Sequence, residues 1–218
     1  MEWLQLEEKE QARTVYLVKW LRILFFWILF ADTGAAILLS EGVLRYCHRP
    51  DLVTLAVSVF ELAGSVLIFL KLGKESTCYL CVIFCLAASF CIETLLLNEG
   101  AGGPLWWGLR MLGIGVGLVN TYQQYRGHTE ILEGINNELA AKWFGLWQWM
   151  VRLSVAGLVG LLIGYILVPS LGGILALAAL IGFVVIGILE LVYLWRTVAA
   201  FQNYVPKERR ELMDEAAL

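Results

Sequence analysis

Charged residues are scarce in this chain: Asp, Glu, Lys and Arg make up 16% of its 218 residues, whereas hydrophobic residues make up 60%. A protein of this length that folds in water needs more polar surface than this composition supplies. The mean hydropathy of +0.74 points the same way. The composition therefore excludes an ordinary soluble domain and indicates a chain whose surface faces lipid.

An excess of basic residues is also missing. The formal net charge is −3 and no basic cluster alternates with aromatic residues, so we expect no nucleic-acid partner. The phosphate-binding loop, the G-x-S-x-G elbow and the H-E-x-x-H zinc motif are absent. The two histidines, His48 and His128, do not complete a zinc set with the cysteines. We therefore predict no catalytic residue, no cofactor and no metal ion.

Long apolar runs are what the chain does have. A helix of about 20 apolar residues crosses a hydrocarbon core of about 30 Å, and six runs reach or approach this length. The sequence predicts an all-α, polytopic integral membrane protein with six transmembrane helices in three hairpins. The predicted spans are Ile23–Leu44, Leu52–Leu72, Cys78–Leu97, Leu105–Thr121, Val151–Val168 and Leu171–Trp195.

Lys and Arg outside these spans are unevenly distributed. Twelve, counting Lys71 at the end of the second span, lie in the N-terminal arm, the second and fourth connections and the tail, whereas the remaining connections carry only Arg45 and Arg49. Basic residues concentrate on the cytoplasmic side of membrane proteins. Both termini are therefore predicted to be cytoplasmic, in a protein of the plasma (inner) membrane.

Apolar residues recur at helical spacing from Ile131 to Met150, within the long fourth connection. They predict an amphipathic helix, which either lies in the membrane interface or packs on the cytoplasmic end of the bundle. The predicted segments are a cytoplasmic arm (1–22), helices one to four (23–121), this cytoplasmic loop (122–150), helices five and six (151–195) and a cytoplasmic tail (196–218).

Ionisable groups inside a span are costly and mark functional or structural sites. Residues equally far from the turn of a helical hairpin lie at equal depth. This relation matches Glu93 with Arg110 in the second hairpin and Arg152 with Glu190 in the third. Because ion pairing offsets much of the cost of burial, we predict two structural ion pairs.

The first hairpin instead places two acids, Asp32 and Glu61, at similar depth near mid-membrane. Ser58 and Ser65 share the helix face of Glu61, and small residues let helices approach closely. Two adjacent carboxylates do not both ionise at low cost, so these acids are expected to share a proton, coordinate a cation or contact a cationic substrate. The alternative is two protonated acids that are hydrogen-bonded within the protein and serve only its structure.

Cys78 and Cys81 have the C-x-x-C spacing of thiol redox sites. The predicted topology places them at the cytoplasmic end of a span, where thiols stay reduced. The leading hypothesis is thus a small transport or ion-coupling protein surrounded by the lipid bilayer. The alternatives are a non-catalytic protein that assembles with a protein partner or a second copy of itself and, after that, a membrane thiol oxidoreductase.

Overall fold

The computed structural model describes residues 2–46, 48–98, 103–166 and 169–204, and every regular element in these ranges is a helix. The all-α prediction is therefore confirmed for this part of the chain. The first helix continues without a break from α1 through a π-helix, η1, into α2. The elements are α1 (Glu2–Phe26), η1 (Trp27–Asp32), α2 (Thr33–Leu38), α3 (Glu41–Leu44), α4 (Pro50–Leu72), α5 (Thr77–Asn98), α6 (Pro104–Leu132), α7 (Asn137–Ile166) and α8 (Pro169–Gln202).

Four segments of the described chain are long and apolar enough to cross a membrane: Lys9–Ala35, Leu52–Leu72, Thr77–Leu96 and Gly172–Gln202. In their most apolar stretches, only 11% to 22% of the residues are buried inside the protein. Apolar helices with so little burial are suited to a lipid environment. The structure therefore supports a membrane protein with four helices able to span the bilayer, while six spans and the orientation stay predictions.

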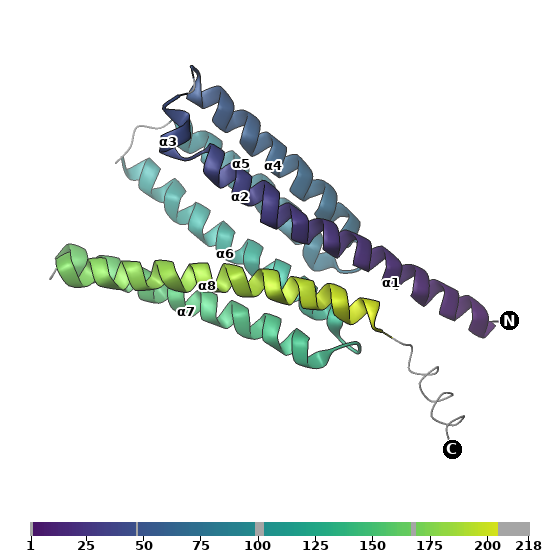
Figure 1. Ribbon diagram of the computed structural model, residues 1–218. Helices are drawn as coiled ribbons and strands as arrows, with labels where there is room; N and C mark the ends of the chain where they lie inside the picture. Colours follow the sequence, from purple (N-terminus) through teal and green to yellow (C-terminus); the bar gives the residue numbers. More distant parts are fainter. Residues whose placement is uncertain (1, 47, 99–102, 167–168, 205–218) are drawn as a thin grey trace.

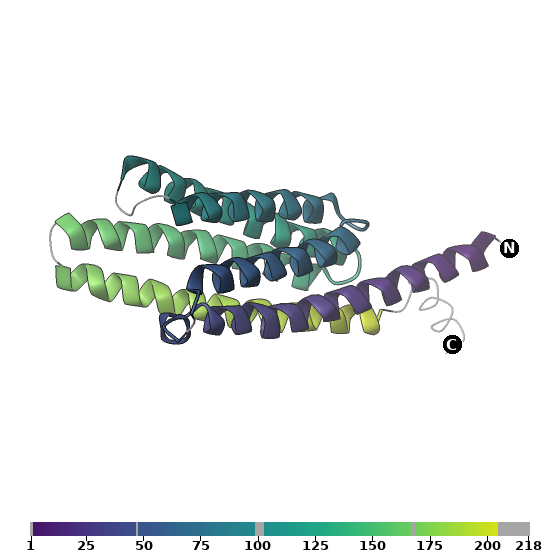
Figure 2. The ribbon, with the colours of Figure 1, turned by 90° about the horizontal axis from the view of Figure 1, so that it is seen from above.

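The long helices close into a ring in which each lies beside its neighbours in sequence. Figure 1 and Figure 2 show α4 beside α5, α5 beside α6, α6 beside α7 and α7 beside α8, while α1 contacts both α4 and α8. The start of α1 and the end of α8 lie at the same end of the ring. The turns after α4 and α6 lie at that end, which we call the terminal end.

The tightly packed core lies toward the terminal end. Its largest fully buried side chains are Trp143, Tyr79, Tyr125 and Phe201, which come from α7, α5, α6 and α8. Toward the other end of α7 and α8, glycines bring the two helices together. A Cβ at Gly160 would lie 2.6 Å from the Leu175 Cβ, so no larger residue fits there without a shift.

The first apolar helix differs from its predicted bounds. The segment able to span a membrane is Lys9–Ala35, earlier than the predicted Ile23–Leu44, because α1 already begins at Glu2 and α2 ends at Leu38. The predicted arm is therefore helical over most of its length. The six-residue π-helix had no counterpart in the apolar pattern, and such segments are rare and often found at functional sites.

The segment 122–150 comprises the end of α6, a turn and the start of α7, which continues into the predicted fifth span. Gly134 makes the turn possible through its φ of +80°, and the Asn136 side chain caps α7 by accepting a hydrogen bond from the Leu139 N–H at 3.0 Å. Ile131 and Trp143 are buried in the core. This burial favours the second alternative, in which the apolar residues pack on the bundle.

Candidate functional site

A groove of about 310 Å³ with both polar and apolar walls lies between α4 and α5. On α4, residues 58, 61 and 65 follow one another at one helix turn and share a face. On α5, residues 89 and 93 are one turn apart and face them across the groove. The polar side chains that line the groove are Ser58, Glu61, Ser65, Ser89 and Glu93, with Leu62, Leu86 and Phe90 completing the walls.

Glu61 is the half-buried acid at the centre of this set. In the described part of the chain no Lys, Arg or His forms an ion pair with it. Its neighbours in the groove are hydroxyl groups and a second acid. A carboxylate among oxygen atoms, without a protein cation beside it, is suited to bind a proton or a small cation.

The second acid, Glu93, does have a cationic partner. The Arg110 Nη1 lies 3.7 Å from the Glu93 Oε1, and the guanidinium also lies 5.3 Å from the centre of the Trp106 ring. The structure thus brings together the two residues that were matched by depth across the second hairpin. Arg110 compensates the charge of Glu93, which leaves Glu61 as the acid of the groove that pairs with no cation in the described part of the chain.

Trp27 of the π-helix, rather than a small residue, occupies the contact between η1 and α4. Its Nε1 donates a hydrogen bond to the Ser65 Oγ at 3.1 Å, and a Cβ added at Gly64 would collide with its ring. Asp32 is the last residue of η1, but its side chain lies outside the described side chains. The expected contact between Asp32 and Glu61 therefore stays a prediction.

Glu190 on α8 receives hydrogen bonds from α6. The Tyr125 hydroxyl donates to Glu190 Oε2 at 3.1 Å and the Gln124 Nε2 donates to Oε1 at 3.2 Å. Arg152, which was expected to pair with Glu190, is exposed and its guanidinium lies 5.2 Å from the centre of the Trp149 ring. The two donors from α6 were not found from sequence, because depth matching considers only the two helices of one hairpin.

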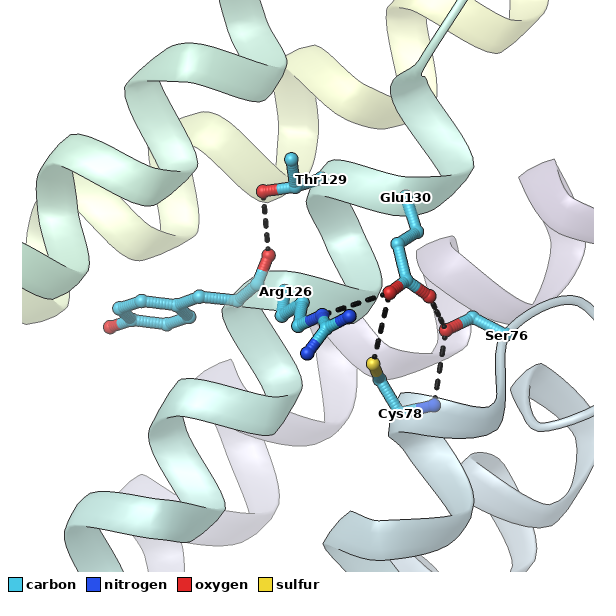
Figure 3. Close-up of polar contacts among 6 residues, drawn as sticks. Ser76, Cys78, Arg126, Thr129 and Glu130 are labelled. Atoms are coloured by element: carbon cyan, nitrogen blue, oxygen red, sulfur yellow. Dashed lines mark hydrogen bonds and ion pairs between the residues drawn. The ribbon is translucent and has the colours of Figure 1, made fainter.

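A second polar cluster joins the start of α5 to α6 around the Glu130 carboxylate (Figure 3). Ser76 Oγ donates to Glu130 Oε2 at 2.7 Å, while Arg126 Nε and Cys78 Sγ donate to Oε1 at 3.0 and 3.3 Å. Partial burial acts to raise the pKa of Glu130, but these three hydrogen bonds outweigh it and hold that pKa below its usual value. Only the Arg126–Glu130 pair, four residues apart on one helix, has a signal in the sequence.

This cluster bears on the thiol alternative. The Cys78 thiol donates a hydrogen bond to the Glu130 carboxylate, and a thiolate at the same place would be repelled by that carboxylate. Cys78 and Cys81 are both free thiols. Cys78 lies in the first turn of α5 and near Arg126, both of which favour a thiolate, but burial and the hydrogen bond to Glu130 favour the protonated thiol. The geometry therefore disfavours redox chemistry at this C-x-x-C motif.

His128 lies at the centre of the core. Its Nδ1 is 2.9 Å from the Tyr79 hydroxyl oxygen and its ring stacks on Trp143 with centroids 4.4 Å apart. The Trp143 Nε1 in turn donates to the Thr197 Oγ1 at 3.1 Å. Burial lowers the pKa of His128 from 6.5 to about 3, so the ring is neutral at physiological pH. These contacts join α5, α6, α7 and α8, which indicates a structural role.

Among the described residues, no three His, Cys, Asp or Glu side chains gather in a way that could together hold a metal ion. Comparison with known proteins found no matching family model, no matching curated protein and no matching solved structure. The groove between α4 and α5 and its uncompensated carboxylate are therefore the observations from which a function is inferred.

Proposed function

We propose that this protein is a small membrane transport or ion-coupling protein whose polar centre is the groove between α4 and α5. One observation carries the proposal: three residues expected to form a transport site, Ser58, Glu61 and Ser65, line one groove together with Ser89 and Glu93. The groove separates two helices that are both long and apolar enough to cross a membrane.

The charge of the groove indicates what it would bind. Arg110 lies near Glu93 and offsets its charge, so the groove has one net negative charge when Glu61 is ionised and none when Glu61 binds a proton. Hydroxyl and carboxylate oxygens are the ligands that hard cations prefer. A single negative charge among serine hydroxyls suits a proton or a monovalent cation better than a divalent one.

The proposal includes six spans, with both termini in the cytoplasm of a plasma-membrane protein. Helices α6 and α7 fall outside the four segments that meet the length and hydropathy requirements. They lie in the same ring as those four, however, beside α5 and α8. The distribution of Lys and Arg among the connections supports the orientation.

Flux measurements in proteoliposomes test this function. The wild-type protein is reconstituted with a dye that responds to protons, Na⁺ or K⁺ inside the vesicles, and movement of the matching ion is started with a concentration gradient. Glu61→Gln keeps the size of the side chain but removes its charge, so flux is expected to fall to the level of empty vesicles. Glu133→Gln, which changes an exposed acid at the turn after α6, is the matched control and is expected to keep wild-type flux.

Two results would contradict the proposal. Equal flux in Glu61→Gln and wild type would remove Glu61 from the transport path. Absence of flux in the wild type for protons, Na⁺ and K⁺ would favour the second candidate, assembly with a partner. The exposed glycines of α6 favour that candidate, because a Cβ at Gly108 or Gly115 would meet no atom within 4 Å. Their seven-residue spacing places them on one helix face, where another helix could approach closely.

A further inference from the structure

The largest of the cavities described lies at the terminal end, away from the groove between α4 and α5. It has a volume of about 490 Å³ and is bounded by the turn after α6, the start of α7 and the end of α8. Its hydrophobic floor comes from Ile135, Leu139, Ala199 and Ala200. Its polar groups are hydrogen-bond donors for the most part: Asn136, Lys142, Arg196, Asn203 and Tyr204.

The charges around this cavity do not cancel. Glu138, the acid in its lining, accepts a hydrogen bond from Lys142 at 2.5 Å. Hydrogen bonding to Lys142 and the charges of Lys142 and Arg196 lower the pKa of Glu138, so this acid is ionised and paired. Arg196 has no ion pair in the described part of the chain. The described lining residues thus carry one net positive charge, and the Arg196 guanidinium, which acts on Glu138 only through its charge, has donors left for an anion.

An arginine with open donors matches a phosphate group in both charge and shape. The planar guanidinium donates two parallel hydrogen bonds to phosphate oxygens, which a lysine does not. The Asn203 amide and the Tyr204 hydroxyl lie on the same wall, since both follow Arg196 near the end of α8. They add neutral donors for the remaining phosphate oxygens or for a polar headgroup.

The surroundings of the cavity point to a lipid as the source of the phosphate. Arg196 lies six residues before the end of the apolar segment Gly172–Gln202, where the headgroup region is expected. Two aromatic residues nearby, Trp195 next to it in sequence and Phe144 of α7, expose 47% and 48% of their surface. Aromatic side chains at the ends of spans belong to the interface between headgroups and acyl chains. Basic pockets between membrane helices on the cytoplasmic side commonly bind anionic headgroups.

We propose that the cavity between the start of α7 and the end of α8 binds the phosphate of an anionic phospholipid, with Arg196 as the principal ligand. The phosphate accepts hydrogen bonds from the guanidinium, while Asn203 and Tyr204 contact the headgroup. The acyl chains then lie along the exposed apolar faces of α7 and α8. This site does not depend on the transport groove, which lies between α4 and α5.

Binding is measured with the purified full-length protein in a neutral maltoside detergent. The probes are dioctanoyl phosphatidylglycerol, dioctanoyl phosphatidylcholine, glycerol 1-phosphate and inorganic phosphate. We expect phosphatidylglycerol to bind and phosphatidylcholine to bind more weakly. Arg196→Gln should weaken phosphatidylglycerol binding about tenfold or more, the usual effect of losing charge-assisted hydrogen bonds. Arg196→Lys should recover part of the loss, because lysine keeps the positive charge but not the two parallel donors of the guanidinium.

The controls separate this site from general attraction to a basic surface. Arg22→Gln removes an exposed arginine of α1 outside the cavity and should leave binding unchanged. If Arg196→Gln does not fold, Asn203→Ala, at an exposed position, replaces it and should weaken binding severalfold. Equal binding by Arg196→Gln and wild type, or equal losses in Arg22→Gln and Arg196→Gln, would overturn the proposal. Glycerol 1-phosphate or inorganic phosphate binding as tightly as phosphatidylglycerol would reject the lipid and assign the site to a soluble phosphate.

Discussion

Replacing His128 should change how the stability of this protein depends on pH. His128 is fully buried between Tyr79 and Trp143, and its Nε2 has no hydrogen-bond partner in the described part of the chain. A proton added to this ring would carry a positive charge into the core without an acid to balance it. Folding therefore keeps the ring neutral, whereas the unfolded chain lets it titrate near its ordinary value.

The size of the effect follows from the two pKa values. Below pH 6.5 the unfolded chain binds a proton that the folded chain, with a pKa of about 3 at His128, does not bind. The contribution of the neutral ring to the free energy of unfolding is fully present above pH 6.5 and decreases as the pH falls toward 3. Linkage converts this difference into a loss of about 2 kcal/mol between pH 7.5 and pH 5. His128→Phe removes the titrating ring, so this part of the pH dependence should disappear.

The assay is unfolding of the purified protein in mixed micelles, with the denaturing detergent titrated at several values between pH 5 and pH 7.5. His128→Phe also leaves the Tyr79 hydroxyl without its partner, which costs roughly 1–3 kcal/mol at every pH. The slope with pH, rather than the absolute stability, is therefore compared. Tyr79→Phe is the matched control, since it loses the same hydrogen bond but keeps the His128 imidazole. It should therefore keep the wild-type slope of stability against pH. Equal slopes in wild type and His128→Phe would refute the reasoning.

Two further predictions concern contacts between helices. Glu130→Gln should speed up the alkylation of Cys78, because the carboxylate that disfavours the thiolate is gone; mass spectrometry of the labelled peptide measures the rate, and an unchanged rate would mean that Glu130 does not control this thiol. Gly64→Ala should destabilise the protein by about 1–3 kcal/mol in the same unfolding assay, because the added methyl group collides with Trp27. Gly115→Ala meets open space and is the control; equal stability of the two variants would show that Trp27 does not pack against α4.

The residue pattern was sufficient to predict the helical class and most of the helix positions. Runs such as Leu52–Leu72 are apolar throughout, and α4 ends at the predicted residue. Polar or glycine-containing turns separate the helices, so antiparallel neighbours follow from the short connections. The same reasoning matched Glu93 with Arg110, whose side chains lie 3.7 Å apart. These features are local or depend on one hairpin, which is why periodicity and turn positions reveal them.

Contacts between helices of different predicted hairpins depend on the tertiary structure and could not be predicted from the sequence. Glu190 belongs to the α7–α8 hairpin but accepts hydrogen bonds from α6. Glu61, on α4, faces the groove between α4 and α5. The Trp27 ring occupies the space above Gly64, a contact that the pattern of small residues did not predict. In each case the identity of the neighbouring helix determines which chemistry is available to the side chain.

The physical reason lies in the environment of an apolar helix. In water, a helix must turn its apolar face toward the core, so the face that packs can be identified from the sequence. In lipid, an apolar face is as stable against acyl chains as against another helix, and helix pairing depends on close packing and hydrogen bonds instead. The sequence by itself therefore determined that these helices form and which residues they carry, whereas the closure of the ring determined that Glu61 meets α5 and that His128 meets Tyr79 and Trp143.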